Sequence, residues 1–158
     1  MKEKKAVSSS QVVMTQLVLP THTNALDTVF GGTVMSWIDI VGAIAAQRHS
    51  ASDVVTASID QLNFIAPIRK GWVVNLKASV NFTSRTSMEI GVRVDAENPK
   101  TSEMFHTASA YLTFVALGSD GRPSLIPGLI LVSDIEKRRF ASAEKRRAQR
   151  LANKNNDS

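Results

Sequence analysis

Hydrophobic and polar residues alternate with a period of two along residues 72–82 and 88–95, which are two of four strand-like segments between residues 54 and 117. This period is typical of β-strands that bury one face. Turn-forming residues separate the alternating segments, so the pattern predicts consecutive antiparallel strands joined by hairpins. The predicted strands cover residues 54–64, 72–82, 88–95 and 103–117. A further strand is predicted from Gln11 to Leu19, where Pro20 ends it.

One long segment has the period of an α-helix instead. From Gly32 to His49 apolar residues return every three or four positions, which predicts a helix. Its core-facing side consists of Val34, Ile38, Val41 and Ala45. A second side carries mostly short side chains and one acid, namely Met35, Asp39, Gly42, Ala43 and Ala46. Because apolar positions occupy most of the circumference, we expect an α+β fold with the sheet curved around a helix buried on nearly all sides.

The start of this helix carries the strongest chemical signal in the chain. Gly31 and Gly32 lead into it, and glycines there leave backbone N–H donors open to a developing negative oxygen. Asp39 follows about two turns later and is the only acidic residue between Asp27 and Asp53. A carboxylate that can take a proton from water, together with such donors, predicts hydrolysis.

Composition narrows the class of protein. The 158 residues, 43% of them hydrophobic, fit one domain with a core of ordinary size. The chain has no cysteine, and its histidines (His22, His49 and His106) lack the spacing of metal ligands, so we expect no metal site. The first residues lack the apolar region of a signal peptide, and no apolar stretch reaches the roughly 18 residues of a membrane span. We therefore expect a cytoplasmic protein.

The net charge of +5 is concentrated at the two ends of the chain. Residues 6–133 carry 8 basic and 9 acidic side chains, whereas residues 134–158 carry 8 basic and 4 acidic ones. We expect a disordered N-terminus over residues 1–10, a folded domain over 11–132, and a basic C-terminal helix and tail over 133–158. A basic tail alone is weak evidence for a nucleic-acid partner, so we interpret it as a solvated helix that frays at its end.

Several short motifs resemble the acyl-CoA hydrolase family of hotdog-fold thioesterases. The helix entrance of that family is similar to Thr23-Asn24, Phe30-Gly31-Gly32 and Met35-Ser36-Trp37-Ile38-Asp39. Further agreement lies at Val55-Thr56-Ala57, Asn63-Phe64-Ile65-Ala66-Pro67-Ile68, Gly71, Arg85-Thr86-Ser87-Met88 and Tyr111-Leu112-Thr113-Phe114-Val115-Ala116. Asp27 departs from the resemblance, because the family usually has glycine there. The resemblance spans residues 16–127 and implies a hotdog fold, an antiparallel sheet of five to six strands wrapped around a long central helix, with a C-terminal helix added.

The same resemblance implies hydrolysis of acyl-CoA to a free fatty acid and coenzyme A, without a cofactor. It implies Asp39 as general base or as nucleophile, and Asn24 as the residue that positions water or the thioester carbonyl. The N–H groups at Gly31 and Gly32 would form the oxyanion hole. For the phosphates of coenzyme A we select Arg85, Thr86, Ser87 and Arg93. For the acyl group we select Val34, Met35, Ile38 and Phe64.

An exposed sheet edge and a smooth helix face predict at least a dimer. The resemblance implies that Asn24 of one chain serves Asp39 of the other, and that three dimers form a hexamer. Two alternatives remain open. One is a non-catalytic acyl-CoA sensor on the same fold, with the basic tail contacting a partner. The other is a hydratase, which would need a histidine such as His22 beside an acid.

Overall fold

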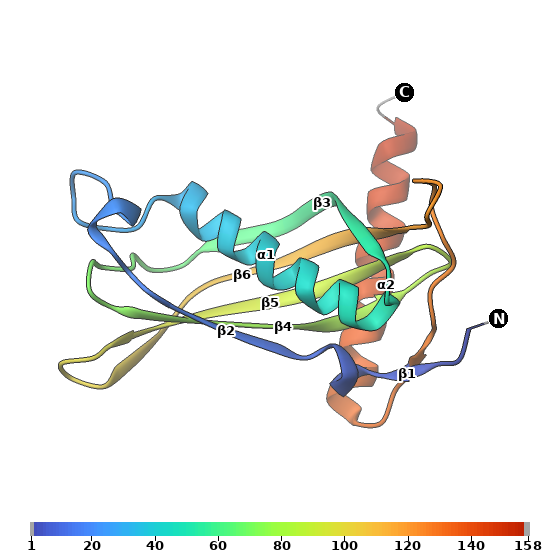
Figure 1. The fold of residues 1–158 in the computed structure, drawn as a ribbon, viewed down its shortest axis with the longest axis horizontal. Helices are drawn as coiled ribbons and strands as arrows, with labels where there is room; N and C mark the ends of the chain where they lie inside the picture. The colour runs from blue at the N-terminus through green and yellow to red at the C-terminus, as the bar shows by residue number, and fades with distance from the viewer. Residues whose placement is uncertain (1, 157–158) are drawn as a thin grey trace.

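Five antiparallel strands form the main sheet of the computed structural model, which describes residues 2–156. Their order across the sheet is β2-β4-β5-β6-β3, so β2 and β3 are its edges. Helix α1 lies along one face of this sheet, and helix α2 crosses the strands near one end (Figure 1). The strands are β2 (Val12–Leu17), β3 (Asp53–Phe64), β4 (Val73–Thr83), β5 (Ser87–Asn98) and β6 (Glu103–Leu117). The helices are α1 (Gly31–Ser50) and α2 (Asp134–Asn156), and the short elements are β1 (Lys5–Ala6), β7 (Leu129–Ile130) and the 3-10 turns η1 (Val7–Ser10) and η2 (Pro20–His22). The predicted antiparallel sheet around a long helix is confirmed.

Helix α1 and the sheet enclose the hydrophobic core. The predicted core-facing residues of α1 are buried, and the apolar positions of β4 and β5 alternate inward as predicted. Gly42 and Ala46 also face the sheet, and their assignment to the second side of the helix was wrong. They follow Ile38 at steps of four residues and so continue its row. A Cβ on Gly42 would lie 3.1 Å from a ring carbon of Phe114, so glycine lets the helix approach β6 closely.

The other side of α1 is left open by this chain. Met35 and Ile40 are 38% and 51% exposed, and Gly32 and Ser36 are exposed as well. The expectation of a helix buried on nearly all sides therefore does not hold within one chain. The open side lies next to β3, a 12-residue edge strand whose outer hydrogen-bonding groups have no neighbour in the sheet.

Bulges in β4 and β3 change the face of the sheet to which the following side chains point. The register of β4 with β5 shifts between Val80 and Phe82, and Phe82 packs on Phe140 of α2 with ring centroids 4.8 Å apart. Strict alternation had placed Phe82 with the core-facing residues of its strand, which is wrong for this reason. In β3 the register with β6 shifts between Thr56 and Ser58 and again after Asp60. An extra residue in a strand inverts the alternation beyond it, so Thr56 and Asp60 face opposite sides of the sheet.

The C-terminal helix is docked on the sheet, not solvated along its length as expected. Arg146 donates two hydrogen bonds, of 2.8 and 2.9 Å, to the buried carboxylate of Glu89. Its guanidinium carbon also lies 3.6 Å from the ring centre of Tyr111. Arg150 pairs with Asp60 of β3 at 3.0 Å. Two basic residues of α2 thus bind carboxylates of the sheet face opposite α1.

The N-terminal residues are ordered from Lys5 onward, contrary to the expected disorder of residues 1–10. Strand β1 pairs in parallel with β7, and Val7 and Ser10 are buried. The Ser10 hydroxyl donates to the Val7 carbonyl and accepts from the backbone N–H of Val80 at 3.0 Å. These hydrogen bonds attach the segment to strand β4.

Candidate active site

The loop before α1 is folded around the side chain of Asn24. The Oδ1 atom accepts hydrogen bonds from the backbone N–H groups of Leu26 (2.9 Å) and Thr28 (3.3 Å) and from the Thr28 hydroxyl (3.2 Å). These bonds fix the orientation of the carboxamide, as in other turns built on asparagine. Among residues 2–156 no group accepts a hydrogen bond from Nδ2 of Asn24, so this donor is available to a ligand.

Asp27 lies in the same loop, at the position where the family resemblance led us to expect glycine. Its φ angle is +59°, in the left-handed region that glycine adopts freely and that aspartate tolerates better than most residues. Its backbone carbonyl accepts from the N–H of Lys70 at 3.0 Å, and its carboxylate lies 3.5 Å from the Lys70 ammonium. Asp27 therefore adopts the left-handed conformation in a turn that hydrogen bonds to Lys70.

Gly31 and Gly32 form the first turn of α1 and are exposed. The N–H groups of Thr33 and Val34 bond to the Phe30 carbonyl, whereas those of the two glycines have no acceptor among the described residues. No side chain caps this helix end, and a Cβ on Gly32 would meet nothing within 4 Å. Free N–H groups at the positive end of a helix dipole can hold an anion.

Asp39 lies on the open side of α1 and is half-buried. Its Oδ1 accepts a 2.6 Å hydrogen bond from the hydroxyl of Thr56, which is exposed on edge strand β3. The bulge after Thr56 is what turns this side chain toward the helix while Asp60 faces α2. Sequence reasoning missed Thr56, although it had noted the segment Val55-Thr56-Ala57 as part of the family resemblance.

The carboxylate and the glycines lie at different heights along α1. Asp39 follows Gly32 by seven residues, and a rise of 1.5 Å per residue separates them by about 10 Å along α1. One water molecule cannot bridge that distance with two hydrogen bonds.

The four residues selected for the acyl group fall into two environments. Val34 and Ile38 are buried in the core between α1 and the sheet. Met35 and Phe64 are exposed on the open side, and the Phe64 ring would lie 3.5 Å from a Cβ on Gly31. Of these four residues, only Met35 and Phe64 can touch a ligand on the open side without rearrangement of the core.

The residues selected to bind coenzyme A also lie in two separate places. Arg85, Thr86 and Ser87 lie in and beside the β4–β5 turn, where the Arg85 carbonyl accepts from the N–H of Ile126 at 3.0 Å. The neighbouring Pro127 carbonyl bonds His49 near the end of α1, so this turn lies about 30 Å, one helix length, from the helix start. Arg93 lies on the sheet face opposite α1, paired with Asp95 at 3.1 Å.

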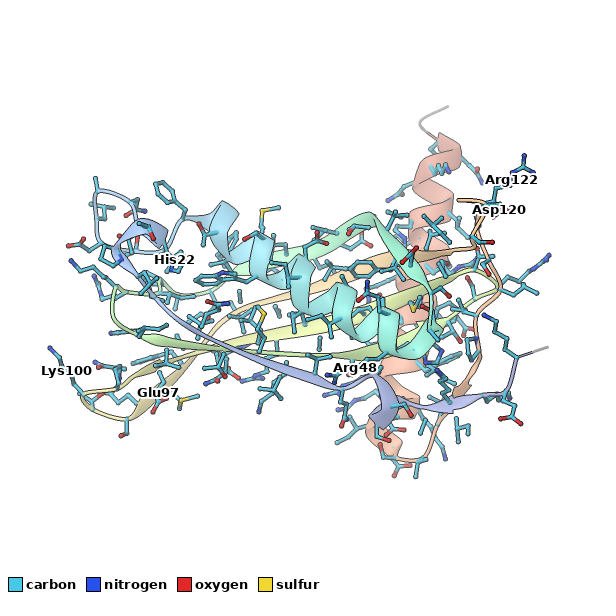
Figure 2. The ribbon with its side chains drawn as sticks, viewed as in Figure 1. His22, Arg48, Glu97, Lys100, Asp120 and Arg122 are labelled. Carbon is cyan, nitrogen blue, oxygen red and sulfur yellow. The ribbon has the colours of Figure 1, made fainter. Side chains whose placement is uncertain are left out.

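The contacts of His22 indicate a structural role. Its Nδ1 accepts from the backbone N–H of Leu19 at 3.0 Å, and its ring packs edge-on against Trp37 with centroids 5.1 Å apart. Figure 2 shows His22 beside the start of α1, whereas Asp120 and Arg122 lie at the other end of the sheet. Among residues 2–156 no cluster of three or more histidine or acidic side chains could hold a metal ion. Neither described helix has the length and hydropathy needed to cross a membrane.

Comparisons with known sequences agree with one another. A family model described as thioesterase superfamily matches residues 26–103. The protein YkhA of Bacillus subtilis, named an uncharacterized acyl-CoA thioester hydrolase, is 36% identical over 96% of this chain and 93% of its own length. The cytosolic acyl coenzyme A thioester hydrolase of Mus musculus is 38% identical over 95% of this chain, and this chain spans 40% of that relative.

Solved structures are similar over nearly the whole chain. An apo-hexameric acyl-CoA thioesterase has a TM-score of 0.92 at 38% identity, covering 96% of this chain and 97% of its own. An acyl-CoA hydrolase from Staphylococcus aureus, solved with butyryl coenzyme A, coenzyme A and coenzyme A disulfide, has a TM-score of 0.86 at 36% identity, covering 97% and 96%. The Staphylococcus aureus hydrolase was also solved as three variants, with an aspartate, an asparagine and a threonine replaced by alanine.

Proposed function

The chain belongs to the thioesterase superfamily, and we propose that it hydrolyses acyl-CoA thioesters with Asp39 at the reacting centre. The observation that carries this proposal is the half-buried Asp39 carboxylate, held by Thr56 at 2.6 Å on the open side of α1. A carboxylate anchored at one oxygen keeps lone pairs on the other for a proton from water. Its position beside an unpaired sheet edge lets a second chain complete the site.

The spacing of three residues supports the assignment. In the Staphylococcus aureus hydrolase, the replaced aspartate lies 15 residues after the replaced asparagine, and the replaced threonine lies 17 residues after the aspartate. Asn24, Asp39 and Thr56 have the same spacing in this chain. We therefore assign these three residues to one site.

The reaction follows from the chemistry of these groups. Asp39 accepts a proton from water as the water oxygen bonds to the thioester carbon, and the carbonyl oxygen becomes an anion. The N–H groups of Gly31 and Gly32 stabilise that anion, and each such donor typically contributes about 3–4 kcal/mol in the transition state. The C–S bond then breaks, and the proton held by Asp39 passes to the leaving thiolate. The free Nδ2 donor of Asn24 orients the water or the carbonyl.

A nucleophilic role for Asp39 is the competing route. The carboxylate would bond directly to the thioester carbon and expel the thiolate, and water would then hydrolyse the resulting anhydride. The two routes differ in where a labelled oxygen goes. In a single turnover in ¹⁸O-water, attack of water on the anhydride at the Asp39 carbonyl leaves ¹⁸O in Asp39, whereas a general base leaves Asp39 unlabelled.

We propose that two chains form each site. If two α1 helices pack antiparallel about a twofold axis near Met35 and Ser36, then Gly32 of one chain lies beside Asp39 of the other, because both are equally far from the axis. Met35 and Ser36 are exposed, as this packing requires. The hexameric state of one similar thioesterase supports further assembly of such dimers into a hexamer.

The antiparallel arrangement also gathers the residues proposed to bind substrate. With the axis near Met35 and Ser36, the helix start of one chain lies opposite residue 40 of the other, so the end of α1 with the turn of Arg85, Thr86 and Ser87 lies about 15 Å farther along the helix. This cation and these two hydroxyls can then meet the phosphates of coenzyme A, while Met35 and Phe64 contact the acyl group. The substrate supplies the coenzyme, and we propose no other cofactor. We propose a cytoplasmic location, because one relative is named cytosolic.

The test is hydrolysis of a panel of acyl-CoA esters, followed by release of free thiol. Replacing Asp39 by alanine should lower kcat by about 10²–10⁴, the usual contribution of a general base. Replacing Asn24 by alanine should also lower kcat, and both variants should keep the Tm of the parent. An Asp39→Ala enzyme within a factor of a few of the parent would remove Asp39 from the mechanism.

A further inference from the structure

A cavity of about 580 Å³ lies between α2 and the sheet face opposite α1. Strands β4, β5 and β6 form its floor, and α2 forms one wall with Arg138, Arg139 and Ser142. The sheet separates this cavity from Asp39, which lies on the α1 side. It is therefore distinct from the candidate active site of the same chain.

The cavity gathers positive charge without carboxylates of its own. Five cationic side chains line it and no acidic one does; the cations are Lys77, Arg93, Arg138, Arg139 and Arg146. Arg93 and Arg146 are already neutralised, by Asp95 and by Glu89. The other three form no ion pair with any residue in the range 2–156. Uncompensated like charges held around one space repel one another, and a bound anion relieves that repulsion.

Polar donors complete the lining. Ser79, Ser109 and Ser142 contribute hydroxyls, and the floor includes Gly91 beside Asn81. A Cβ on Gly91 would lie 2.7 Å from Nδ2 of Asn81, so only glycine leaves the floor open without displacing that amide. Arginine guanidinium groups and hydroxyl donors are the groups that recognise phosphate oxygens. The volume suits a small ligand.

We propose that this cavity binds a small phosphate-bearing anion at a second site, independent of acyl-CoA. In this proposal, the basic C-terminal helix forms part of an anion-binding site. Its sheet-facing arginines anchor it on Glu89 and Asp60, and that docking holds Arg138 and Arg139 over the cavity. The anion would bridge α2 and β4, because Lys77 lines the cavity from the sheet side.

The experiment is titration of inorganic pyrophosphate into the full-length oligomer by calorimetry. The double variant Arg138→Gln/Arg139→Gln should bind at least tenfold more weakly, because a hydrogen bond to a charged group contributes about this factor or more. The matched control Lys137→Gln/Lys145→Gln removes two charges from exposed positions of the same helix that do not line the cavity. It should bind within about twofold of the parent.

A second arm tests independence from acyl-CoA. Pyrophosphate should bind equally well when coenzyme A is saturating, and the Arg138→Gln/Arg139→Gln variant should hydrolyse acyl-CoA within about twofold of the parent, which shows that it is folded. Loss of binding in the presence of coenzyme A would overturn the proposal, because the cavity would then hold the phosphates of the substrate. An equal loss in the control variant, or no saturable binding to the parent, would overturn it as well.

Discussion

The hydrogen bond from Thr56 to Asp39 joins the central helix to the edge strand at 2.6 Å. It fixes the direction of the Asp39 carboxylate on the open side of α1. Replacing Thr56 by alanine should lower kcat by about 10- to 100-fold with little change in KM, because a hydrogen bond to a charged group is worth about 1.5–3 kcal/mol. Thr56→Ser keeps the hydroxyl and should retain most of the activity. Steady-state kinetics of both variants is the measurement, and equal losses in the two would show that packing of the methyl group matters instead.

His49 is fully buried at the end of α1, so the free energy of unfolding should depend on pH through this residue. Its Nε2 donates to the Pro127 carbonyl at 2.7 Å, and its buried Nδ1 has no partner among the described residues. Burial lowers the pKa of His49 below its ordinary value of 6.5; the bond to Pro127 opposes this shift, and nearby Lys5 adds to it.

The contribution of His49 to the free energy of unfolding should therefore be fully present above pH 6.5. It should be lost as the pH falls below 6.5, because the unfolded chain then binds a proton at His49 that the folded chain does not. The slope from this residue is at most about 1.4 kcal/mol per pH unit. His49→Gln keeps a donor for Pro127 and removes the titration, so its urea-unfolding free energy should change less than that of the parent between pH 7.5 and 5.5. His22 and His106 are present in both proteins and cancel in the comparison.

At the scale of an element, one buried ion pair contributes to the docking of α2. Glu89 is 3% exposed and also accepts a hydrogen bond from Asn81. Its hydrogen bonds raise the pKa of Arg146, against the effect of burial. Arg146→Ala should cost about 3–5 kcal/mol of unfolding free energy, because it leaves a buried carboxylate without its cation. Lys145→Ala, at an exposed position next to it, should stay within about 0.5 kcal/mol in the same denaturant titration. If the two variants lose equal stability, the pair does not hold the helix.

The sequence predicted the elements better than their contacts. The alternation in β4 and β5 and the helical period after Gly32 depend on burial of one face, which leaves a direct trace in residue order. The bulge after Thr56 leaves no such trace, because it exists only in the register between β3 and β6. The same limit explains the C-terminal helix. Its arginines could be counted, but their partners Glu89 and Asp60 lie 57 and 90 residues away along the chain.

At the scale of the whole molecule, the proposal of a two-chain site rests on the open side of α1 and on the separation of about 10 Å between Gly32 and Asp39 along the helix. A shared site makes a prediction that a site within one chain does not. Two inactive variants, Asn24→Ala and Asp39→Ala, should recover activity when they are mixed, because one of the two sites in a mixed dimer combines an intact Asn24 with an intact Asp39. After unfolding and joint refolding in equal amounts, half of the dimers are mixed, so about a quarter of the parent activity should return. The control is each variant refolded alone, which should stay inactive. If the refolded mixture is no more active than its components, Asn24 and Asp39 of the same chain serve the same site, and the proposed twofold arrangement is wrong.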